Sequence, residues 1–256
     1  MSGEVDLGSG ERTAALVASL SVLAERVPTS EFAVIGGLAV LAHLGGAHRV
    51  TDDLDTVAAQ RGDAPSAVEL LVAERGTAGA ILGTKVDAIA VGDIPAAALP
   101  SSELPTDELD RAFVLAHRWG LDDAQELAVV ASDPAAGTRA QARCRFASPA
   151  SIVAMKLQAA PRRRAGRAYK AGGDYFDIFL LLGHPALTSL IARSLRRAPH
   201  DLGVWSAERI RVFIVDQADR TAAMIARSGV AGLAAPSPAE LARAGRMMLD
   251  QYERGE

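Results

Sequence analysis

The chain has 256 residues, of which 49% are hydrophobic and 4% aromatic, and its formal net charge is -4 at pH 7. This balance excludes a polycation that binds nucleic acid non-specifically, so any contact with RNA or DNA has to come from a local basic segment. The single cysteine, Cys144, excludes a disulfide framework and a multi-cysteine zinc site. Because the start "MSGEVDLGSGE" lacks a secretory signal and no apolar run reaches membrane-spanning length, we expect a soluble, cytoplasmic protein without membrane contact.

The first 95 residues alternate between helical and strand patterns. Leu16, Leu20 and Leu23 lie at helical spacing, and the apolar run "EFAVIGG" indicates a buried strand that ends in a tight turn at Gly36-Gly37. Such alternation predicts an α/β (α+β) fold with a small mixed sheet. The expected elements are helices over residues 11–27, 38–45 and 64–76 and strands over 31–35, 53–58 and 85–91.

The rest of the chain becomes helical. Between residues 94 and 145 we expect a helix over 106–120 and strands over 126–132 and 143–148 that extend the sheet. From Ser148 onward every expected element is a helix, which predicts an α/β domain over residues 1–146 and a helical domain over 147–256. The expected helices cover residues 148–160, 173–183, 185–198, 206–229 and 237–255.

Three carboxylates near the expected strands raise the question of a metal site. Asp53 and Asp55 are two residues apart, so on a strand both side chains point to one face, and a divalent cation is the common way to hold two such charges together. Asp52 has the opposite parity. Asp87 lies between apolar residues, so we expect it to be buried and to have a metal or a cation as its partner, with Lys85 as the simpler alternative.

The Gly36-Gly37 pair follows the first strand and precedes a helix. Glycines at such a turn allow the backbone to approach a phosphate, which the amides of a helix start then bind. The surrounding residues fit neither a GxGxxG fingerprint nor a P-loop, and a plain tight turn is the alternative. Of the histidines, we expect His43 to pack within its short helix and His117 to lie at the surface or at a helix end.

A second group of charged residues lies about a hundred positions further on. Lys156 is the only lysine of an apolar helix, so its stem is expected to pass through packed side chains either to an anion or to water. Asp174 follows, and Asp177 is interpreted as a structural partner for an arginine. The intervening basic residues are either a solvated run or a binding segment for a polyanion such as RNA: Arg162, Arg163, Arg164, Arg167 and Lys170.

Both groups together resemble one known family. The segment "GGLAVLAHLGGAHRVTDDLD" resembles the signature of polymerase-β-type nucleotidyltransferases and is most similar to the AbiEii/AbiGii-type toxins, including the MenT group. The segments "SPASIVAMKLQAAPRRR" and "KAGGDYFDIFLLL" resemble a second motif of that family. Two departures are visible: the extra "LGGA" lengthens the loop before the aspartates, and Ala-Gly-Gly stands where a basic residue often precedes the second-half aspartate.

The resemblance assigns roles to individual positions. It implies Asp53 and Asp55 as catalytic ligands of Mg²⁺, Asp87 as a third carboxylate, and Gly36-Gly37 as the triphosphate-binding turn of an NTP substrate. The resemblance also implies Thr51 beside the metal and Arg49, two positions before Thr51, at the nucleotide. It implies Lys156 at the nucleotide phosphates and Asp174 as a catalytic carboxylate, both in a helical domain that completes the active site.

The implied activity is the Mg²⁺-dependent transfer of NMP from an NTP to a hydroxyl group. The expected acceptor is the 3′ end of tRNA, and the expected biological role is that of a toxin with a separately encoded antitoxin as partner. One alternative is a nucleotidyltransferase that acts on a small molecule or a protein. Another is a catalytically inactive module that only binds nucleotide.

Overall fold

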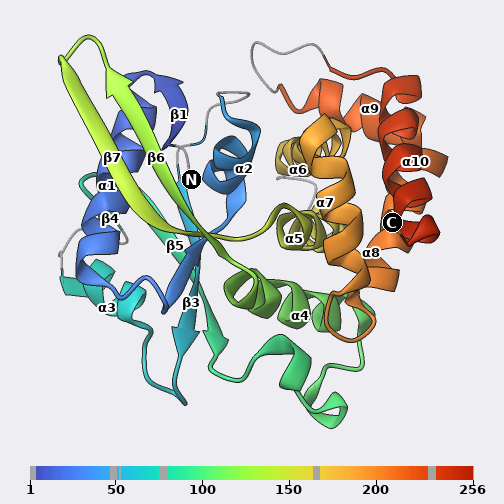
Figure 1. The fold of residues 1–256 in the computed structure, drawn as a ribbon, viewed down its shortest axis with the longest axis horizontal. Helices are drawn as coiled ribbons and strands as arrows, with labels where there is room; N and C mark the ends of the chain where they lie inside the picture. Colours follow the sequence, from blue (N-terminus) through green and yellow to red (C-terminus); the bar gives the residue numbers. More distant parts are fainter. Residues whose placement is uncertain are drawn as a thin grey trace. The chain divides into compact units, whose positions relative to one another are not determined.

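The computed structural model describes residues 4–46, 51, 53–74, 80–163, 168–229 and 235–255. The chain folds into two compact units. The sheet unit comprises residues 1–95 and 120–148, and the helical unit comprises residues 96–119 and 149–256. The fold class is mixed α/β, as the sequence predicts (Figure 1).

The described part of the sheet unit contains one mixed sheet with the strand order β1-β6-β7-β2-β3-β5-β4. Neighbouring strands are parallel in the pairs β1–β6, β7–β2 and β3–β5, and antiparallel in the other pairs. The strands are β1 (Glu4–Ser9), β2 (Phe32–Val34), β3 (Asp53–Gln60), β4 (Ala80–Ile81), β5 (Thr84–Gly92), β6 (Gln125–Asp133) and β7 (Thr138–Phe146).

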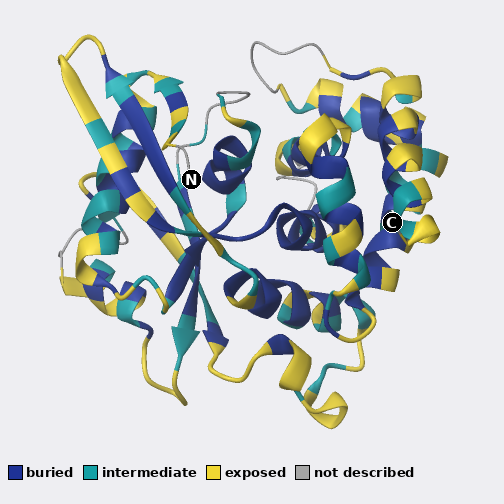
Figure 2. Cartoon of the chain, in the orientation of Figure 1, coloured by how far each residue is buried: buried dark blue, intermediate teal, exposed yellow. Residues whose placement is uncertain are grey.

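Three helices accompany this sheet: α1 (Glu11–Arg26), α2 (Gly36–Leu44) and α3 (Ala67–Glu74). α1 packs along β6 and β7, and α2 packs against β3. α2 is almost entirely apolar. Its residues Gly37 to Ala42 are all buried, so the helix is mostly dark blue in Figure 2. This burial fixes the start of α2 beside β3.

The helical unit consists mainly of long helices. Short 3₁₀ turns (Ala96–Ala98 and Ser101–Glu103) precede α4 (Glu108–Asp122), whose residues up to Trp119 belong to this unit. α5 packs against α6, and α6 packs against α9. The remaining elements are α5 (Pro149–Arg162), α6 (Ala168–Gly183), α7 (Pro185–Arg196), α8 (Leu202–Ile210), a π-helical segment (Arg211–Asp216), α9 (Ala218–Arg227) and α10 (Pro238–Arg254).

Ion pairs attach residues 96–119 to the helical unit. Arg162 at the end of α5 lies 2.6 Å from Asp110, and Arg209 of α8 lies 2.6 Å from Glu108. The sequence places this segment in the α/β domain, whereas in the structure it packs with the helices, and the second boundary falls after Ser148. Nothing in the local pattern of residues 96–119 reveals these partners, which are 52 and 101 positions away.

The structure confirms most of the expected elements, and it differs in one helix and two strands. The single helix expected over residues 206–229 is wrong, because a π-helical segment and the turn at Gln217 divide it into α8 and α9. Strands β1 and β4 are additional. No single helix in the described ranges is long and apolar enough to cross a membrane, and the pair α6–α7 reaches that composition only across a 100° bend.

Candidate active site

Asp53, Asp55, Lys85 and Asp87 occupy one face of the sheet. The parallel register of β3 and β5 places Lys85 beside Asp53 and Asp87 beside Asp55. Residues two apart on a strand point to the same side, and so do neighbours paired across a ladder. The period-two prediction for Asp53 and Asp55 therefore agrees with the strand that the structure shows, and both residues are half-buried.

The opposite face of β5 is covered by α1. Ser19 of α1 is fully buried, and its hydroxyl oxygen lies 2.9 Å from the hydroxyl oxygen of Thr84. Thr84 immediately precedes Lys85, so its side chain points away from the charged face. The four charged residues thus lie on the side of the sheet that α1 leaves open.

Gly36 brings the start of α2 into direct contact with Asp55. Its backbone φ is +68°, in the left-handed region, and a Cβ atom at this position would lie 2.1 Å from Asp55 Oδ2. The amide of Ile35 also donates a hydrogen bond of 2.9 Å to the backbone oxygen of Asp55. Glycine is therefore required at residue 36 both by the positive φ and by the close approach of the Asp55 carboxylate. The predicted turn at Gly36-Gly37 is the first turn of α2.

Lys85 is the cation of this face. Its ammonium group forms an ion pair with Asp87, and both side chains are about half exposed. That hydrogen bond, followed by the charges of Asp87, Asp53 and Asp55, raises the pKa of Lys85. The expected burial of Asp87 is wrong, because its apolar sequence neighbours Val86 and Ala88 point to the other face of β5.

The other predicted residues of this region precede Asp53 in the sequence. The Thr51 hydroxyl lies 3.5 Å from the backbone oxygen of Asp53. Arg49 and Asp52 lie outside the described residues. His43 donates from Nε2 to the backbone oxygen of Ala147 at 2.7 Å, and its burial lowers its pKa. The contact joins α2 to a residue outside this helix, whereas the sequence predicts packing within it.

A magnesium site needs oxygen ligands, which the carboxylates of this face supply. No group of three His, Cys, Asp or Glu side chains within the described ranges is arranged to hold a metal ion. Asp53 and Asp55 nevertheless offer two carboxylates on one partly open face, and Mg²⁺ is usually held by one or two carboxylates together with waters and substrate phosphates. The pair fits such a site, while Asp87 is engaged by Lys85.

A second charged cluster lies inside the helical unit. Lys156 of α5 is buried, and its Nζ atom lies 3.1 Å from Asp174 Oδ1 and 2.8 Å from Asp177 Oδ2, both on α6. Lys156 therefore reaches an anion, which is the first of the two expected alternatives, but the anion is a pair of protein carboxylates. Asp177 pairs with this lysine, and its expected contact with an arginine stays a prediction.

Arg163 completes this cluster. Its Nε and Nη2 atoms both donate to Asp174 Oδ2 at 3.1 Å. At Gly172, α6 approaches α9 so closely that a Cβ atom would lie 2.5 Å from the Met224 backbone oxygen. A Cβ atom on Gly173, directly before Asp174, meets no described atom within 4 Å, so packing explains only the first glycine of "KAGGD". A basic partner for Asp174 thus comes from the segment after α5.

The basic stretch is only partly available to bind a polyanion. Arg162 pairs with Asp107 and Asp110, and Arg163 pairs with Asp174. Arg164 and Arg167 lie outside the described residues, and Lys170 is exposed on α6.

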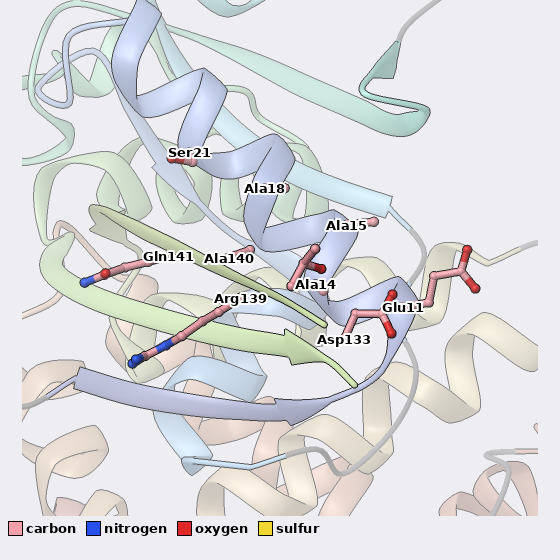
Figure 3. A pocket seen from close by; sticks show the side chains of 10 residues that line it. Glu11, Ala14, Ala15, Ala18, Ser21, Asp133, Arg139, Ala140 and Gln141 are labelled. Carbon is pink, nitrogen blue, oxygen red and sulfur yellow. The ribbon is translucent and has the colours of Figure 1, made fainter. Parts of the chain in front are cut away.

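A pocket of about 630 Å³ lies elsewhere on the sheet unit, between α1 and the β6–β7 hairpin (Figure 3). Its polar lining includes Glu11, Asp133 and Arg139, and no candidate residue that the structure describes contributes to it. The Asp133 carboxylate accepts hydrogen bonds from the amides of Ala135 and Ala136, as expected for a residue that stabilises a turn. The pocket is therefore separate from the candidate site.

The sequence gives Lys85 as the simpler partner of Asp87, and the ion pair between them confirms this alternative. It does not place Arg163 or Asp177 in contact with Asp174 or Lys156. Lys85 shares the parity of Asp87, so the strand period contained the signal. Asp177 is three residues after Asp174 on one helix, which places both on one side of it. Arg163 had no comparable signal, because its contact depends on how the chain leaves α5.

A Gly-Gly helix start packed on a strand that carries Asp-x-Asp, in a mixed α/β fold, defines the chain as a nucleotidyltransferase. Residues 20–227 match the family described as "Nucleotidyl transferase AbiEii toxin, Type IV TA system", and the chain belongs to this family. The predicted resemblance is thereby confirmed. Comparison with curated proteins and with solved structures gave no match.

Proposed function

We propose that the protein transfers NMP from an NTP to the 3′ end of tRNA in the presence of Mg²⁺, and that it acts as the toxin of a toxin–antitoxin pair. The family match supports the transferase and toxin parts of this proposal. The single observation that supports the site is the contact between Gly36 and Asp55, which joins the glycine turn to the carboxylate strand.

We assign the roles on the sheet unit as follows. Asp53 and Asp55 hold Mg²⁺, which when bound neutralises charge on the phosphates. Gly36 and Gly37 bring backbone amides at the start of α2 towards the triphosphate. We also assign Thr51 and Arg49 to nucleotide binding. Asp87 with Lys85 adjusts the charge of the face, so Asp87 is a further carboxylate of the face and not a required ligand.

Lys156 and Asp174 are proposed to serve the same reaction from the helical unit, an assignment supported by a family match that covers residues of both units. The acceptor oxygen forms a bond to the α-phosphorus while the bond to the leaving pyrophosphate breaks. Because such catalysis consists mainly of positioning and charge stabilisation, loss of one ligand is expected to be severe.

The test is incorporation of label from each α-³²P-labelled NTP into total tRNA with Mg²⁺. Asp53→Asn and Asp55→Asn should each reduce incorporation by at least about 100-fold. Asp63→Asn removes an exposed carboxylate three residues after β3 and is the matched control, expected to retain full activity. Label on protein or on small molecules would support another acceptor, and binding of NTP without incorporation would support an inactive nucleotide-binding module.

The antitoxin is a separate part of the proposal. The family belongs to type IV toxin–antitoxin systems, which supports an antitoxin as partner. Expression of the wild-type chain should arrest growth, and expression of Asp53→Asn should not. Growth arrest by both forms would show that toxicity does not depend on transfer.

A further inference from the structure

Lys85 occupies one of the three carboxylates on the charged face of the sheet unit. It forms an ion pair with Asp87, two positions along β5, and among the described residues neither side chain has another ion pair. The parallel register places Lys85 beside Asp53 and Asp87 beside Asp55. A cation of the protein itself therefore lies among the carboxylates from which Mg²⁺ has to take its ligands.

The ammonium group of Lys85 is placed to compete with a metal ion. Asp87 attracts it most strongly, through a hydrogen bond, and the charges of Asp53 and Asp55 attract it as well. The Lys85 side chain is 58% exposed, so packing does not fix its long stem and the ammonium group can turn between these partners. A divalent cation bound to Asp53 and Asp55 thus shares the face with a positive charge that lowers its affinity.

The ion pair also neutralises Asp87 as a metal ligand. Mg²⁺ demands a near-octahedral set of oxygen ligands. Within the described ranges no three carboxylates are arranged to hold an ion, and the engagement of Asp87 by Lys85 is a physical reason for this on the charged face. With two carboxylates only, most positions around the ion are left to water or to substrate phosphates.

We propose that Lys85 limits the affinity of this face for Mg²⁺ because it keeps Asp87 from the metal. Asp53 and Asp55 then hold the ion firmly only when the phosphates of the NTP supply further ligands. This inference rests on the Mg²⁺ site of the proposed function and deepens it, because it names the residue that makes metal binding depend on nucleotide. In the metal-free protein the same ammonium group offsets the repulsion between the carboxylates.

The test titrates Mg²⁺ alone into the metal-free full chain by calorimetry, in about 0.5 M KCl, which screens charges that do not touch the ion. Lys85→Met should lower the Kd for Mg²⁺ at least about 5-fold, because Asp87 then becomes a third ligand. Lys85→Met/Asp87→Asn should return the Kd to within about 2-fold of the wild-type value. Lys85→Arg keeps the charge and should bind Mg²⁺ like the wild type.

Two further variants locate the effect. Arg61→Met removes an exposed cation directly after β3, 3.6 Å from Glu31, and it is the matched control that should leave the Kd unchanged. Asp53→Asn in the Lys85→Met background should abolish the gain, because the gain requires the ion to lie at Asp53. A gain that survives Asp53→Asn would place the ion elsewhere and overturn the inference.

Thermal unfolding gives a second readout that needs neither nucleotide nor tRNA. At saturating Mg²⁺, a Kd that is about 5-fold lower corresponds to about 1 kcal/mol of additional stabilisation. Mg²⁺ should therefore raise the Tm of Lys85→Met by about 2–4 °C more than it raises the Tm of the wild type. An equal rise in both proteins would show that Lys85 does not restrain metal binding.

The outcomes separate this inference from the proposed function. An unchanged or higher Kd of Lys85→Met would overturn the role of Lys85 even if the wild type transfers NMP to tRNA. A Lys85→Met/Asp87→Asn variant that binds Mg²⁺ as tightly as Lys85→Met would also overturn it, because Asp87 would then not be the ligand gained. If the Kd values follow the predicted order but the wild type transfers no nucleotide, the proposed function fails and the role of Lys85 stands.

Discussion

Substitution of Gly36 by alanine tests the contact that joins the glycine turn to the carboxylates. A Cβ atom at residue 36 would lie 2.1 Å from Asp55 Oδ2, whereas real Cβ atoms stay at least 3.0 Å from such neighbours, so the carboxylate has to move by at least the difference of 0.9 Å. Rotation of the carboxylate alone does not relieve the clash, because Asp55 Cβ would also be only 2.9 Å away. Displacements near 1 Å in a catalytic group reduce rates by about 100-fold.

Gly45 provides a matched control within the same helix. It caps the other end of α2 with the same φ of +68°, and a Cβ atom there meets no atom of the described residues within 4 Å. Gly36→Ala and Gly45→Ala should therefore share a backbone strain of about 1–2 kcal/mol in the free energy of unfolding. Only Gly36→Ala should also disturb Asp55.

The assay compares the two variants by urea unfolding and by transfer of labelled nucleotide to tRNA. Gly36→Ala should be less stable than Gly45→Ala by more than about 1 kcal/mol and should lose about 100-fold more activity. Equal stability and equal activity of the two variants would refute the reasoning, because strain at φ +68° would then be the whole effect.

Three further predictions concern stability. Burial lowers the pKa of His117 to about 4 from 6.5, so the neutral imidazole contributes fully to stability above pH 6.5 and less as the pH falls. Protonation of His117 should lower the free energy of unfolding by about 3 kcal/mol at pH 4. His117→Asn should therefore reduce the acid dependence of stability measured by urea unfolding. Gly172→Ala should lower Tm, because α9 leaves no room for a methyl group, whereas Gly173→Ala, with nothing within 4 Å, should raise it slightly. Ser237→Ala should lower the free energy of unfolding by about 1 kcal/mol, measured by circular dichroism melting, since Ser237 and Glu240 form a capping box at the start of α10.

Much of the fold could be predicted from the sequence because its elements depend on local patterns. Helix α1 follows from leucines at helical spacing, and β5 follows from the alternation in "KVDAIAV". The division between α8 and α9 could not be predicted, because a π-helical segment shifts the helical period by one residue without a Gly or Pro to indicate it. Residues 96–119 join the helical unit through ion pairs with distant arginines.

The site shows the same limit. Pairing of Asp53 and Asp55 on one face follows from the strand period alone. The exposure of Asp87 follows from the same period, although its apolar sequence neighbours suggest burial. The sequence places His117 near the surface, but it is 5% exposed, because α4 buries the side on which it lies. The partners of Lys156 are 18 and 21 positions away, and only the packing of α5 on α6 reveals them.

The most direct measurement of the central claim uses one NTP labelled either at the α- or at the γ-phosphate, with intact tRNA and with tRNA whose 3′ end has been oxidised by periodate. NMP transfer predicts label in intact tRNA from the α-labelled NTP only, none in oxidised tRNA, and none from Asp53→Asn or Asp55→Asn. Label in tRNA from the γ-labelled NTP, or undiminished incorporation by both aspartate variants, would contradict the account.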